Sequence, residues 1–139
     1  MYGDTTVIRR LAADLREQAA DIRAEADRLV ARTDAAGWLG RAGDALCERA
    51  RQRALALRRS AALHDDAADA LERHAREVER LQRLIEEIER RVRRLVDAAR
   101  DRLGGIAGAV AHWTDEWLDR FDPPATGSRL WLDVEVPGL

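Results

Sequence analysis

Apolar residues recur every three or four positions through the first quarter of the chain, which places them on one face of a helix. This series consists of Ile8, Leu11, Leu15, Ala19, Ile22, Ala26 and Leu29. Near Asp4 to Thr6, Asp and Thr oxygens are suited to cap the free N–H groups of a first helical turn. The pattern predicts a helix over residues 5–33, with a narrow apolar face and a charged remainder.

A second helical pattern begins after Gly40 and meets no proline before the glycine pair at 104–105. Its distal half alternates spacings of three and four, close to the heptad of a coiled coil. The positions are Leu71, Ala75, Val78, Leu81, Ile85, Ile88, Val92, Leu95 and Ala99. Glu precedes Arg by four residues at several flanking positions, which indicates a solvated flank. We predict a helix over residues 41–103.

The predicted second helix is longer than the first, so its seam from Ile85 onward has no counterpart within residues 5–33. Unless a helix over 106–121 folds back on it, this seam must contact another chain, and we expect an oligomer. The predicted partner interface comprises Ile8, Leu11, Leu15, Ile22, Leu71, Val78, Leu81, Ile85, Ile88, Val92 and Leu95.

Beyond the glycine pair, the helical period returns and then changes. Residues 105–122 predict an amphipathic helix that ends before two prolines and presents Trp113, Trp117 and Phe121 on one face. These aromatics pack on the hairpin or a dimer mate, form an export or partner-docking face, or lie at a membrane surface, which neighbouring acidic residues disfavour. For residues 123–139 we predict an extended or strand-like tail, because Leu130, Leu132, Val134 and Val136 alternate with Trp131, Asp133 and Glu135. A lone strand is unstable, so it needs a partner segment or packs as a tail.

Composition supports an all-α chain of one domain. Charged residues make up 36%, hydrophobic residues 46% and aromatic residues 4%, a balance typical of long helices. The net charge of −2 argues against a nucleic-acid binder. We interpret the basic stretch over residues 49–59 as a solvated or acid-paired face.

No residue pattern predicts an enzyme, a cofactor or a metal site. His64, Asp65 and Asp66 point in different directions on a helix and lack accompanying cysteines. The single cysteine, Cys47, fits a small apolar helix position. The glycines at 104–105 lack the strand and lysine of a phosphate-binding loop. No apolar run approaches the ~18 residues of a membrane span, and the N-terminus shows no signal peptide.

The connection between the two predicted helices places Trp38 between Gly37 and Gly40. Gly37 is suited to end a helix in the left-handed conformation, and Gly40 frees the backbone before the next helix. The indole of Trp38 either covers the open end of a helical bundle or forms a surface for recognition.

These residues carry a family resemblance. Trp38-Leu39-Gly40, followed by Ala42, Ala45 and Leu46, resembles the hairpin of the WXG family of small type VII secretion substrates. The upstream GDTTVIRRLAADLREQAADI and downstream AADALERHAREVERL resemble the two helices of related secretion-signal domains. The resemblance covers roughly residues 3–100 and places a hairpin over 1–104. It implies dimerisation, with itself or a WXG-like paralogue, into an antiparallel four-helix bundle.

The resemblance also implies a protein that is cytoplasmic until a membrane ATPase complex exports it without a signal peptide. We therefore expect a type VII secretion substrate or substrate partner, with the secretion machinery or a toxin as a further partner. The family's Tyr-x-x-x-Asp/Glu export tail is missing, because the single tyrosine is Tyr2. The alternatives are a cytoplasmic coiled-coil adaptor that is never exported, or a chaperone of a secreted toxin that adds RLWLDVEV to the toxin's sheet.

Overall fold

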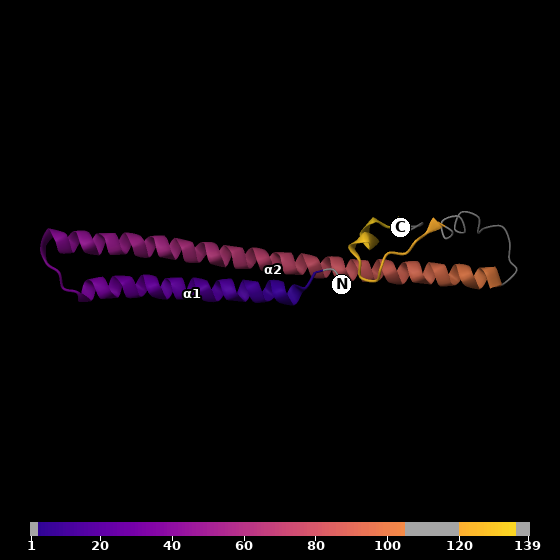
Figure 1. Cartoon of the computed structure of the whole chain (residues 1–139), viewed down its shortest axis with the longest axis horizontal. Coiled ribbons are helices and arrows are strands. Elements are labelled where there is room, and N and C mark those ends of the chain that lie inside the picture. Colours follow the sequence, from indigo (N-terminus) through magenta and orange to yellow (C-terminus); the bar gives the residue numbers. More distant parts are fainter. Residues whose placement is uncertain (1–2, 105–119, 136–139) are drawn as a thin grey trace. The chain divides into compact units, whose positions relative to one another are not determined.

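The computed structural model describes residues 3–104 and 120–135, and their regular elements are all helical (Figure 1). Helix α1 spans Thr5–Ala35, helix α2 spans Gly40–Gly104, and a 3₁₀ helix, η1, spans Arg129–Asp133. The predicted all-α class and the pair of long packed helices are confirmed. Both long helices begin and end within two residues of their predicted bounds.

The chain divides into two compact units, which we describe separately. One unit, the hairpin unit, is residues 5–76 and contains α1 with the first part of α2. The other, the clasp unit, is residues 1–4 with 77–139 and contains the rest of α2 and the C-terminal segment.

In the hairpin unit, α1 and α2 meet along two rows of alanines. All of these alanines are completely buried, and within each helix they are seven residues apart: Ala12, Ala19 and Ala26 in α1, and Ala54, Ala61, Ala68 and Ala75 in α2. Seven residues are close to two helical turns, so each row stays on one face. Because the side chains at a helix contact set the distance between axes, methyl groups allow a close approach. The hairpin core is therefore thin.

Larger apolar side chains of the hairpin lie beside the alanine rows and are only half-buried. They are Ile8, Leu15, Ile22 and Leu29 of α1, and Leu57 and Leu71 of α2. Leu11 was predicted on the same face, but half of its surface is exposed. The reason is rotational: Leu11 precedes Ala12 by one residue, which turns it about 100° away from the helix contact.

In the clasp unit, the C-terminal segment packs on α2. Trp131 is 3% exposed and forms a buried cluster with Ile85 and Val92. Half-buried Phe121, Leu132 and Val134 surround this cluster, together with Ile88, Leu95 and Val96 of α2. The seam that we expected to meet another chain or a folded-back helix is thus covered by residues 121–134 of the same chain, which we call the clasp.

The prediction of a strand-like tail is wrong for the part that the structure describes. Residues 129–133 form η1, and the Ser128 side chain caps it by accepting a hydrogen bond from the Leu130 N–H. Of the two residues that begin the alternating pattern, Leu130 is 62% exposed and Trp131 is buried. The turn at Gly127, with φ +73°, interrupts the extended backbone that a strand needs. Burial of the largest side chain then sets which residue points inward.

Candidate interaction surfaces

Glycines shape the connection between α1 and α2. Gly37 and Gly40 have φ values of +63° and +82°, so both adopt the left-handed conformation that glycine tolerates best. Gly37 lies two residues beyond Ala35, the last residue of α1. Gly43 has a different function, because a Cβ at this position would lie 2.3 Å from the carbonyl oxygen of Trp38. Only glycine permits this close approach of the connection to α2.

The tip of the hairpin presents two neighbouring apolar side chains to solvent. Trp38 is 64% exposed and Leu39 is 94% exposed. The indole does not cover the end of this hairpin, because a core of alanine methyl groups leaves no space for a ring that buries about 150–250 Å². Of the two interpretations of Trp38, exposure favours the surface for recognition.

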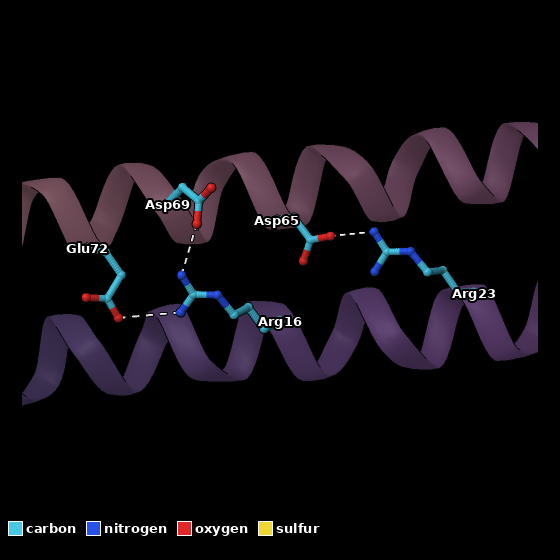
Figure 2. Close-up of polar contacts among 5 residues, drawn as sticks. All are labelled: Arg16, Arg23, Asp65, Asp69 and Glu72. Atoms are coloured by element: carbon cyan, nitrogen blue, oxygen red, sulfur yellow. Dashed lines mark hydrogen bonds and ion pairs between the residues drawn. The ribbon is translucent and has the colours of Figure 1, made fainter.

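One side of the hairpin is closed by ion pairs between the helices. Figure 2 shows Arg16 of α1 between two acidic side chains of α2, at 2.9 Å from Asp69 and 3.4 Å from Glu72. Arg23, seven residues after Arg16 in α1, pairs with Asp65 of α2. Asp65 is therefore paired with an arginine. Among the described residues, no cluster of His, Cys, Asp or Glu could hold a metal ion.

The ion pairs continue toward the tip with the charges reversed. Here α2 supplies the arginines: Arg58 lies 2.6 Å from Asp27, and Arg51 lies 3.8 Å from Asp34. Exposed pairs of this kind contribute about 0–1 kcal/mol each, so they add little stability. Their order along the helices, however, matches only one register of α1 against α2. We call this row of pairs the charged side.

Hydrogen bonding to the charged side perturbs one arginine. The hydrogen bond to Asp69 has the largest effect and raises the pKa of Arg16 above its ordinary value; burial opposes this increase, and the hydrogen bond to Glu72 adds to it. The guanidinium is therefore cationic throughout the physiological range, and the pair with α2 is maintained.

The half-buried apolar residues occupy the opposite side of the hairpin. Arg16 and Arg23 follow buried alanines of α1 by four residues, and Asp65 and Glu72 do the same in α2. Residues that precede the alanines by four must therefore lie across from the charged side. This surface, the apolar flank, consists of Ile8, Leu15, Ile22, Leu29, Leu57 and Leu71.

The apolar flank is hollowed near the tip. A groove of about 400 Å³ is lined by Leu29 and Leu57, with Ala56 between them and the charged residues Glu25 and Arg53 at its border. Further along the same side, His64 is half-buried, and its Nδ1 lies 2.8 Å from the carbonyl oxygen of Ser60. The flank is thus an apolar, shallow surface with polar edges.

The predicted partner interface is divided between the two units. Ile8, Leu15, Ile22 and Leu71 lie on the apolar flank, whereas Ile85 and Val92 are buried beneath Trp131. The remaining positions of α2 are buried against residues near the N-terminus or half-buried in the clasp unit: Val78, Leu81, Ile88 and Leu95. Trp113 and Trp117 lie outside the described residues. Phe121 packs in the clasp, with its ring centroid 6.3 Å from that of Trp131.

Sequence reasoning missed three features of these surfaces. Ala19, Ala26 and Ala75 were named among the apolar positions, but the strict seven-residue repeat of alanines in both helices was not recognised. The pairing of arginines with acids across the helices has no marker within one helix. Trp131 as an anchor had no positional signal, because the alternating pattern grouped it with Asp133 and Glu135.

The clasp borders a second hollow. A pocket of about 560 Å³ lies between α2 and the clasp, and Val92, Val96, Phe121, Pro123 and Trp131 form most of its apolar wall.

Within the described residues, none of the helices combines the length and apolar character needed to cross a membrane.

Comparisons with known proteins give no relative for this chain. No protein-family model matches the sequence, and no curated protein and no solved structure shows significant similarity to it.

Proposed function

We propose that the protein acts by helical pairing: its hairpin associates through the apolar flank with a second hairpin, either another copy or a WXG-like paralogue. The observation that carries this proposal is the one-sidedness of the hairpin. Arginine–carboxylate pairs close one side, while six large apolar residues remain half-exposed on the other. A second apolar flank covers these residues and completes a four-helix bundle with a W-x-G turn at its end.

The thin alanine core supports this interpretation energetically. Burial of apolar surface contributes roughly 25 cal/mol per Å², and a methyl group offers little of it. The leucines and isoleucines of the flank leave part of their apolar area accessible along one side of the hairpin. Pairing removes this area from water, and contiguous exposed apolar surface of this kind is typical of protein interaction sites.

We further propose that the pair is a type VII secretion substrate or substrate partner, as the WXG resemblance implies. The exposed Trp38 and Leu39 support a docking role for the tip, because adjacent large apolar side chains at a turn are suited to enter a pocket of another protein. In this proposal, the flank holds the mate and the tip contacts the export machinery or an effector.

The two roles are separable by experiment. The chain is expressed with its neighbouring genes in its own host, purified through a tag, and assayed for co-purified hairpin proteins and for export into the medium. We expect Trp38→Ala to abolish export while the mate is still captured. The matched control is Leu63→Ala, which removes a side chain of α2 that is also exposed, at 68%. We expect this variant to leave both export and capture of the mate unchanged.

Three results would count against this proposal. Capture of a mate without export of the wild type supports a cytoplasmic coiled-coil adaptor instead. Capture of a toxin through residues 129–136 supports the chaperone alternative. Export that is unaffected by Trp38→Ala removes the docking role of the tip.

A further inference from the structure

The row of α2 that carries the hairpin alanines changes chemistry in the clasp unit. Every seventh residue of this row faces what packs on the helix, and its members are Ala54, Ala61, Ala68, Ala75, Gln82, Glu89 and Val96. Four alanines occupy the row where α1 packs, and two polar residues follow in the clasp unit. The alanines of this row contact a helix, whereas its two polar residues contact irregular backbone.

Glu89 is a buried acid with a backbone partner. It is 6% exposed, and its Oε1 accepts a hydrogen bond from the N–H of Gly127 in the clasp. Its other oxygen lies 3.6 Å from Arg93, which also donates to Thr126 at 3.3 Å. Among the described residues, no buried side-chain polar atom is left without a partner. The carboxylate is thus satisfied by the clasp's own main chain.

Gln82 repeats the arrangement one heptad earlier. Its Nε2 donates a hydrogen bond of 2.8 Å to the carbonyl oxygen of Gly3. Gly3 and Gly127 both have positive φ values, +67° and +73°, so neither belongs to a regular helix. A Cβ at Gly3 would lie 2.6 Å from Val78, which shows how closely that backbone approaches α2.

The backbone of a helix interior cannot supply these partners. Interior N–H and C=O groups of a helix are already bonded to one another, and only the terminal turns keep free groups. A helix laid over Gln82 and Glu89 would displace the backbone groups of Gly3 and Gly127, and it would have to replace both hydrogen bonds with side chains placed in register. Turns of irregular backbone have free N–H and C=O groups and satisfy both residues.

We infer that α2 between Val78 and Val96 is a docking surface for irregular backbone, that Gln82 and Glu89 select this occupant, and that residues 121–134 of the same chain fill it at Glu89, with the backbone of Gly3 at Gln82. The clasp meets the requirement with a glycine turn for Glu89 and with Trp131 as its apolar anchor. Its indole Nε1 donates to the carbonyl oxygen of Ala125 at 3.0 Å, so the buried ring also leaves no free donor.

This selection confines helical pairing to residues 5–76. The apolar residues of the distal α2 seam would otherwise offer a second copy a coiled-coil surface. With the clasp seated and two polar residues in the contact row, a helix of another copy is admitted only at the hairpin. This consequence rests on the proposed pairing function, whereas the docking assignment itself does not.

Amide hydrogen exchange of residues 121–135, measured by mass spectrometry on the full chain, tests the role of Glu89. We expect Glu89→Ala to accelerate exchange in this segment by about tenfold, because the Gly127 N–H loses its acceptor. Glu89→Gln retains an acceptor oxygen and keeps most of the protection. The control is Glu86→Ala, which removes an exposed acid from the same helix. Unchanged exchange in Glu89→Ala, or equal loss in Glu89→Gln, overturns the assignment.

The double variant Gln82→Ala/Glu89→Ala tests the selection against helices. It extends the alanine row to residue 89, and we expect its particle mass by light scattering to increase above that of the wild type. A mass equal to that of the wild type, with the clasp released, overturns the selection. If the wild type itself has the mass of one chain but Glu89→Ala still exposes the clasp, then the proposed pairing function fails and the docking assignment stands.

Discussion

The methyl group of Ala61 lies completely buried where α1 and α2 meet. Replacement by leucine adds three carbon atoms at a contact that has no room for them, and the helices must separate. We expect Ala61→Leu to lower the free energy of unfolding by about 1–3 kcal/mol, the range observed for overpacked cores. Urea denaturation followed by circular dichroism measures it. Ala62→Leu, which changes an exposed neighbour, is the control and should have no comparable effect.

For the substitution of Gly43 by alanine, helix propensity and packing predict opposite changes in stability. Propensity alone makes Gly43→Ala more stable by about 1 kcal/mol, because glycine is a poor helix former. The new Cβ, however, would lie 2.3 Å from the carbonyl oxygen of Trp38. We expect a net loss of about 1–3 kcal/mol in unfolding free energy. A stabilised Gly43→Ala variant would contradict the close approach, and Asp44→Ala serves as the control.

At the scale of elements, the charged side fixes how α1 lies on α2. We expect Arg16→Glu to lower the melting temperature at low ionic strength, because a third carboxylate then faces Asp69 and Glu72. At about 1 M salt, where the Debye length is ~3 Å, the difference from the wild type should nearly vanish. A difference that persists at high salt would show that Arg16 acts through packing. Arg10→Glu, at an exposed position, is the control.

The pH dependence of the same element follows from the raised pKa of Arg16. A group whose pKa is raised by folding adds stability below its unfolded pKa and loses it only as the pH rises through the folded value. The melting-temperature difference between the wild type and Arg16→Gln should therefore remain constant from neutral to moderately alkaline pH. A difference that falls over this range would contradict the assignment of the cation.

The two long helices could be predicted from sequence because their apolar spacing persists over many turns and glycines mark the connection between them. The position of each helix contact could not, since small alanines rather than large leucines define it. The prediction of a strand over residues 129–133 was wrong for a physical reason as well. Alternation over a few residues fits a strand, but the Gly127 turn and the burial of Trp131 favour η1 instead.

The predicted partner interface stays a prediction, and only part of it lies on one surface. Ile8, Leu15, Ile22 and Leu71 were expected at a partner interface, and the structure places them together on the apolar flank. The side of the hairpin that remains open could not be inferred, because it depends on which arginines find acids across the helix contact. The burial and hydrogen bond of Glu89 could not be predicted either, since the donor is a backbone N–H of a segment far along the chain.

For the whole molecule, pairing through the apolar flank is the central claim. Ile22 lies in the middle of the flank, so Ile22→Glu places a charge in the proposed contact and should separate the mates. Leu63→Glu adds the same charge to an exposed position of α2 away from the flank and should leave them paired.

The mass of the particle purified from its own host at micromolar concentration, measured by light scattering, tests this claim most directly. One chain has a mass of 15.6 kDa. Our account predicts about twice this mass for the wild type and for Leu63→Glu, from two copies or from one copy with a hairpin mate of similar size, and the mass of one chain for Ile22→Glu. A wild type with the mass of one chain and no companion, or an Ile22→Glu variant that remains paired, would contradict it.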